Sequence, residues 1–227
     1  MCRMTISVFL SVVLLSCGST ESKDVNGDTV KVSGQKNNSQ EKFDLANMTF
    51  KESISDLLKK EGLQFSDGLP GATTLMHYEP FSTSAANLLV FDGHSLGGKA
   101  GANDNHLVLH YSTEGNRIDC YEAMIYTAEA ASALEESLNQ RYGKSVFLKD
   151  SGLDTSAIRL DENGEKMKGP REDIKYQRWE DHKNGIAYHL VTRTTARKLT
   201  VAEFTAINPN SKDAKNWIQY KMLGFYY

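Results

Sequence analysis

The feature that most constrains the fold is a change of hydrophobic period that occurs twice along the chain. Apolar residues recur at helical spacing in two segments, at about 50–61 and 128–142, and alternate with polar residues in the segments that follow. Gly62 and Gly143 provide the stop signals of the two helices. A chain that alternates between these periods is expected to fold into antiparallel sheet covered by helices.

Segments with a period of two predict strands after each helix. They are 73–79, 86–92, 106–112 and 117–126 after the first helix, and 145–149, 174–180, 186–194 and 199–207 after the second. Asn184-Gly185 predicts a hairpin turn between two of these strands. The polar stretch 149–173 predicts a long loop, and a third helix is predicted from Ser211.

The order of these elements predicts an α+β fold with antiparallel β-sheet and helices packed on one face. The globular region is expected to span 43–227, either as one body or as two tandem helix-plus-strands units, 43–126 and 127–227. Two such units would resemble, in outline, the layout of the beta-lactamase inhibitor protein and of small outer-membrane assembly lipoproteins. No binding residue follows from that resemblance.

The N-terminus has the parts of a secretory signal peptide. Arg3 supplies a positive charge, an apolar run extends from Ile6 to Leu15, and the small residue Ser16 precedes Cys17. The apolar run is too short to span a bilayer, which takes about 20 residues. Leu14-Leu15-Ser16-Cys17 resembles the lipobox of bacterial lipoproteins. This resemblance implies that residues 1–16 are a signal peptide and that Cys17 carries lipid after cleavage.

The resemblance to lipoproteins also implies a location in the cell envelope. Gly18 stands where many inner-membrane lipoproteins have aspartate, which implies the outer membrane. The resemblance implies that the segment 17–42 begins with a lipidated Cys17. The rest of this segment contains few sizeable apolar side chains, so we expect a disordered tether. Within it, Asp28-Thr29-Val30 resembles the short acceptor motif for O-glycosylation in the Bacteroidetes.

One loop resembles a catalytic motif. Gly93-His94-Ser95-Leu96-Gly97 matches the nucleophile elbow of lipases, which would make Ser95 the nucleophile of a serine esterase with His189 as a candidate base. The elbow needs a helix after the serine, whereas breakers follow here and lead into another strand. The preferred interpretation is a flexible connection, 92–104, between antiparallel strands. Serine labelling by a fluorophosphonate probe, lost in Ser95→Ala, would favour the esterase.

The same loop, read as far as Lys99, resembles a phosphate-binding P-loop. Ala100 stands where that motif needs a magnesium-binding hydroxyl, so no cofactor is expected. His106 and His110 share a strand face and are a candidate metal pair, although no third ligand is fixed by the spacing. Cys120 lies in an alternating strand pattern and is expected to be a small buried hydrophobe.

The charge balance argues against a nucleic-acid partner. The chain has a formal net charge of −3 and no run of basic residues.

Taken together, the signal peptide, the tether and the strand pattern predict a membrane-anchored envelope lipoprotein that acts as a non-enzymatic binding or assembly module. Its expected partners are the membrane, through the lipid, and a protein or other envelope component.

Overall fold

The computed structural model describes residues 42–69, 71, 75–151, 159–160, 166–167, 172–196 and 198–221. All described residues belong to one compact unit, Glu41–Tyr227. The predicted signal peptide, Cys17 and nearly all of the predicted tether lie outside the described residues. Most of the predicted loop 149–173 lies outside them too.

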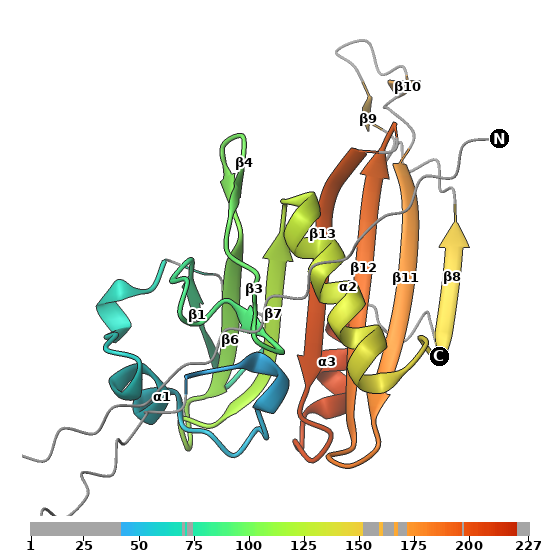
Figure 1. The fold of residues 1–227 in the computed structure, drawn as a ribbon. Helices are drawn as coiled ribbons and strands as arrows, with labels where there is room; N and C mark the ends of the chain where they lie inside the picture. Colours follow the sequence, from blue (N-terminus) through green and yellow to red (C-terminus); the bar gives the residue numbers. More distant parts are fainter. Residues whose placement is uncertain are drawn as a thin grey trace, which may run out of the picture. The chain divides into compact units, whose positions relative to one another are not determined.

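The fold is built on a seven-stranded antiparallel sheet in the order β1-β6-β7-β13-β12-β11-β8 (Figure 1). The strands are β1 Tyr78–Thr83, β6 His106–Ser112, β7 Ile118–Ile125, β8 Phe147–Ser151, β11 Glu172–Asp181, β12 Ile186–Thr195 and β13 Lys198–Ile207. β7 pairs with β13, so strands from 43–126 and from 127–227 belong to one sheet. The predicted hairpin at Asn184-Gly185 is confirmed, because β11 and β12 pair across it.

Three helices and several short elements complete the described part of the fold. The helices are α1 Ile54–Lys60, α2 Ala128–Tyr142 and α3 Ala214–Tyr220, with 3-10 turns η1 Leu45–Asn47 and η2 Phe65–Asp67. The two-stranded ladders pair β2 Val90–Phe91 with β3 His94–Ser95, β4 Lys99–Ala100 with β5 Asn103–Asp104, and β9 Arg159–Leu160 with β10 Lys166–Met167. The predicted α+β fold with antiparallel sheet is confirmed.

The two faces of the sheet carry separate apolar clusters, because side chains alternate along each strand. On one face Leu190 and Phe204 pack with Ile54 of α1 and Leu134 of α2. The other face carries a smaller cluster that includes Trp217 of α3. Figure 1 shows α2 crossing one face of the sheet while α3 lies behind it. The prediction that the helices pack on one face thus holds for α1 and α2, whereas α3 covers the other face.

The bounds of α1, β1 and β2 differ clearly from prediction. α1 begins at Ile54 rather than at about residue 50, because Phe50 has a φ of 61° and Ser53 is the residue that caps the helix. Phe50 is nonetheless buried, which explains its helix-like apolar spacing. The strand predicted at 73–79 is found as β1, Tyr78–Thr83. The strand predicted at 86–92 is reduced to Val90–Phe91 of β2.

Candidate functional site

The lipase-like motif is folded as a hairpin. β2 pairs with β3, and the turn between them has positive φ at Asp92 (50°) and Gly93 (77°), as a two-residue hairpin turn requires. The carboxylate of Asp44 accepts hydrogen bonds from the backbone N–H groups of Asp92 and Gly93, both at 2.8 Å. The positive φ of the turn therefore explains the glycine at position 93. The predicted connection 92–104 contains parts of two short β-ladders rather than an irregular loop.

Ser95 and His189 are not brought together. Ser95 is exposed, and its Oγ accepts a hydrogen bond from the N–H of Gly97 at 3.2 Å. Its neighbour Leu96 belongs to the apolar cluster on the α2 face of the sheet. His189 is buried on β12 and lies against Tyr176, which belongs to the cluster on the α3 face. Burial, together with the charge of Arg178, lowers the pKa of His189 to about 3.

The P-loop-like end of the segment is a second hairpin. Lys99 in β4 forms an exposed ion pair with Asp104 in β5, at 3.3 Å. Asn105, which is buried, then donates hydrogen bonds to the carbonyl of Leu96 and to Thr127 Oγ1, both at 2.8 Å. Asn105 thus ties the loop to the start of α2, which the sequence pattern did not indicate.

His106 and His110 share a strand face as predicted, but their surroundings differ. His110 is buried, its Nε2 lies 2.5 Å from Glu122 Oε1, and its ring lies 4.7 Å from that of Trp217. Lys221 Nζ lies 2.6 Å from the same Glu122 oxygen. His106 is half-buried, with Nδ1 3.1 Å from the carbonyl of Asp104. Within the described residues, no group of three or more His, Cys, Asp or Glu side chains could hold a metal ion.

Cys120 lies on β7 and is fully buried, as expected for a structural cysteine. Burial raises the pKa of its thiol well above the usual value, and the nearby Glu122 raises it further. The thiol is therefore a poor nucleophile in the folded chain.

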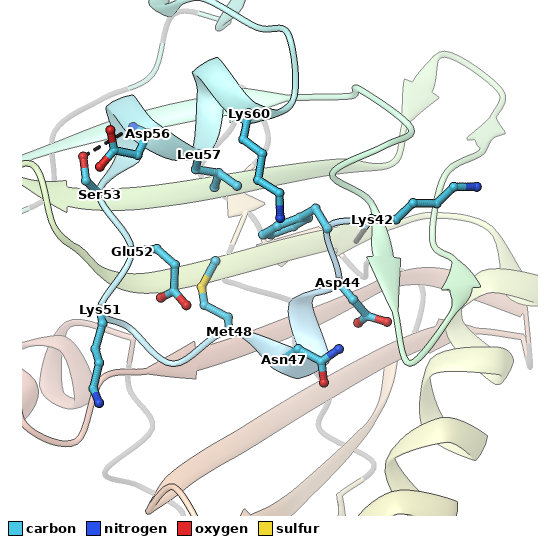
Figure 2. Close-up of a pocket in the computed structure, with 11 residues that line it drawn as sticks. Lys42, Asp44, Asn47, Met48, Lys51, Glu52, Ser53, Asp56, Leu57 and Lys60 are labelled. Carbon is cyan, nitrogen blue, oxygen red and sulfur yellow. Dashed lines mark hydrogen bonds between the residues drawn. The ribbon is translucent and has the colours of Figure 1, made fainter. Parts of the chain in front are cut away.

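The N-terminal cleft, shown in Figure 2, lies between the segment 42–53 and α1 and has a volume of about 480 Å³. Phe43, Met48 and Leu57 give it an apolar base, and charged side chains surround them. Figure 2 shows Lys60 extending from α1 toward the start of the segment. The N-terminal cleft is lined by Lys42, Phe43, Asp44, Asn47, Met48, Lys51, Glu52, Ser53, Asp56, Leu57 and Lys60. The size and the mixed lining suit a small ligand or a side chain of a partner.

Glu52 lines this cleft, and only one of its two carboxylate oxygens has a hydrogen-bond donor among the described residues. Its Oε1 accepts hydrogen bonds from the N–H and the hydroxyl of Thr49, at 3.0 and 2.9 Å. The bond from the N–H of Thr49 resembles the carboxylate half of a helix capping box, although α1 begins only at Ile54. Its Oε2 is buried and has no hydrogen-bond partner within the part of the chain that the structure describes. A buried acceptor of this kind favours a bound donor.

A second cleft, the Arg117 cleft, lies beside the first and has a volume of about 410 Å³. Its lining residues are Lys51, Ser53, Tyr78, Ser112, Glu114, Gly115, Arg117, Asp119 and Lys212. Lys51 and Ser53 line both clefts. The two clefts therefore share the part of their walls formed by Lys51 and Ser53.

Asp119 is the buried anchor of the Arg117 cleft. It accepts hydrogen bonds from Tyr78 Oη (2.9 Å), Asn208 Nδ2 (2.7 Å), Ser211 Oγ (3.3 Å) and Arg117 Nε (3.1 Å). Burial raises the pKa of Tyr78 to about 12, so its hydroxyl remains a donor to this carboxylate. The donors come from distant parts of the chain, which is why residue spacing gave no sign of the network.

Comparison with known proteins adds no relative. No family model, no curated protein and no solved structure matches the chain at a significant level.

Among the described residues, no helix combines the length and the apolar character needed to cross a membrane.

Proposed function

We propose that this chain is an envelope lipoprotein, held to the membrane by lipid on Cys17, whose folded part binds a partner through the N-terminal cleft. The observation that carries the binding role is the buried Glu52 Oε2, an acceptor without a partner in the described part of the protein and on the wall of this cleft. A ligand with an N–H or O–H donor would complete its bonding, and the apolar base formed by Phe43, Met48 and Leu57 would receive the adjoining apolar part of the ligand.

The place of the cleft in the chain supports the same role. Lys42, the last residue of the predicted tether, is also a lining residue of the cleft. The proposed lipid would make attachment stable, because each buried methylene contributes about 0.8 kcal/mol and two or more acyl chains are retained. A partner bound in the cleft would therefore be held close to the point where the tether enters the folded part.

Site-specific photo-cross-linking in living cells tests the binding role. Asp56 is an exposed residue on the cleft rim, and Lys183 is an exposed residue of the β11–β12 turn that serves as the control position. A photoreactive amino acid at position 56 is expected to give an adduct of defined mass, and the same amino acid at position 183 is not.

The decisive variant is Glu52→Gln, combined with the cross-linker at position 56. It replaces a carboxylate by an amide of similar size, so loss of the acceptor is expected to reduce the adduct at least about fivefold, which corresponds to about 1 kcal/mol. An adduct of undiminished yield in Glu52→Gln, or equal adducts from positions 56 and 183, would contradict the proposal.

A further inference from the structure

We propose that the Arg117 cleft binds the phosphate group of a small polar molecule. The geometry points to an oxyanion because three cationic side chains, Lys51, Arg117 and Lys212, line one cleft of about 410 Å³. Two carboxylates, Glu114 and Asp119, also line it, so positive charge is in excess. The inference needs neither lipid on Cys17 nor binding in the N-terminal cleft.

Arg117 is held in a fixed orientation. Its Nε and Nη2 lie 3.1 and 3.5 Å from the two carboxylate oxygens of Asp119, which is itself anchored by Tyr78, Asn208 and Ser211. The N–H groups of Nη1 have no acceptor within the described residues, and the side chain is half-exposed, 50%. A guanidinium whose orientation is already set loses little conformational entropy when it binds an anion.

The two lysines can respond to a ligand. Lys51 is exposed and has no ion-pair partner among the described residues. Lys212 Nζ lies 3.2 Å from Glu114 Oε2 in a pair that is about two-thirds exposed on both sides. Because such surface pairs contribute only about 0–1 kcal/mol, Lys212 can exchange its carboxylate for a bound anion.

Two hydroxyl groups supply neutral donors. Ser53 Oγ accepts the N–H of Asp56 at 3.4 Å, and Ser112 Oγ accepts the N–H of Glu114 at 3.3 Å. Since each serine uses its oxygen as an acceptor, each retains its O–H for a ligand. Guanidinium, ammonium and hydroxyl donors together match the several oxygens of a phosphate dianion better than the two of a carboxylate. The cleft is larger than a phosphate ion, which suits a phosphorylated small molecule.

Titration calorimetry on the purified full chain tests the site, with inorganic phosphate, glycerol 3-phosphate and dihexanoyl phosphatidic acid as probes and glycerol as the uncharged control. Saturable binding of a phosphate probe is expected, and glycerol is expected not to bind. Preference for glycerol 3-phosphate would identify soluble phosphates as the source of the ligand. Preference for dihexanoyl phosphatidic acid would identify lipid headgroups. Absence of saturable binding by every phosphate probe would overturn the proposal.

Matched variants locate the binding. Arg117→Gln is expected to weaken phosphate binding at least about tenfold, because it removes a charge-assisted hydrogen bond. Gly115 lines the cleft, and a Cβ at this position meets no atom within 4 Å, so a side chain can be introduced there without a clash at its first carbon. Gly115→Glu adds a negative charge and is therefore expected to bind phosphate at least about fivefold more weakly than Gly115→Gln, which adds a neutral side chain.

The Gly115 pair keeps the test independent of folding, since both side chains have nearly the same size and differ in charge. Equal affinities in Gly115→Glu and Gly115→Gln would overturn the proposal, as would unchanged affinity in Arg117→Gln. Photo-cross-linking from position 56 tests the N-terminal cleft. Its failure would contradict the proposed binding role of that cleft but would not affect the result for phosphate binding in the Arg117 cleft.

Discussion

At the scale of single residues, buried polar groups on the α3 face connect segments that are far apart in the chain. Asp119 joins β7 to β1 through Tyr78 and to the 208–211 turn through Asn208 and Ser211. A buried carboxylate is costly unless several donors satisfy it, as they do here. The consequence is that Arg117, its exposed partner, is placed with little freedom to move.

His189 gives the fold a pH dependence. Its pKa is about 3 in the folded chain, against about 6.5 in the unfolded chain, because the ring is buried and Arg178 lies near it. Below pH 6.5 the unfolded chain takes up a proton that the folded chain does not. The free energy of unfolding is therefore expected to fall as the pH is lowered from 6.5, with a contribution from His189 that approaches about 1.4 kcal/mol per pH unit.

Urea unfolding at pH 7, 6 and 5 measures this contribution. His189→Gln is expected to have a shallower pH dependence than the parent chain, because glutamine does not titrate. His182→Gln is the control, since His182 lies exposed in the β11–β12 turn. A parent and a His189→Gln variant with the same slope would show that His189 is protonated in the folded state.

At the scale of elements, α3 is attached to the sheet by apolar packing around Trp217 and by an ion pair just after the helix. Trp217 is fully buried, with its ring 5.1 Å from that of Tyr78. Just after the helix, Lys221 pairs with Glu122 on β7, which also bonds His110. Burial alone would raise the pKa of Glu122, but the hydrogen bond from His110 and the charge of Lys221 outweigh it, and the pKa is lowered.

Glu122→Gln is expected to destabilise the fold by about 2–4 kcal/mol, because it leaves His110 and Lys221 without their carboxylate in a largely buried place. Glu203→Gln is the matched control on β13. Its pair with Arg193 is about one-third exposed, so a loss below about 1 kcal/mol is expected. Urea unfolding of both variants measures the difference, and equal losses would mean that Glu122 does not fasten α3.

The sequence predicted best the elements whose apolar pattern depends only on residues close together in the chain. The predictions for α2 at 128–142 and β6 at 106–112 match the structure residue for residue, because each has a complete apolar period. The start of α1 and the place of β1 were wrong by several residues, since long-range packing decides them. Phe50, for example, stacks on Tyr121 with ring centroids 5.8 Å apart.

The candidate sites were less predictable than the fold. The Gly-x-Ser-x-Gly pattern at Ser95 drew attention to a turn whose glycine is needed for positive φ, which residue types alone do not reveal. The two clefts combine segments that are far apart in the sequence, such as Lys51, Arg117 and Lys212. A signal was present at Ile118-Asp119-Cys120, where a charged residue stands in an otherwise apolar strand, but its partners could not be identified without the fold.

At the scale of the whole molecule, the proposed function joins a lipid anchor, a tether and a single α+β body. The body begins at the N-terminal cleft, so binding and attachment would meet at the same end of the folded chain. Attachment to the membrane would raise the effective concentration of a membrane-associated partner at the cleft, without any additional contact between the two proteins.

Metabolic labelling with a palmitate analogue tests the central claim most directly. The parent chain and Cys2→Ala are expected to incorporate label and to sediment with membranes, because Cys2 lies within the predicted signal peptide. Cys17→Ala is expected to lose both the label and the membrane association. Label that persists in Cys17→Ala, or a parent chain that carries none, would contradict the account.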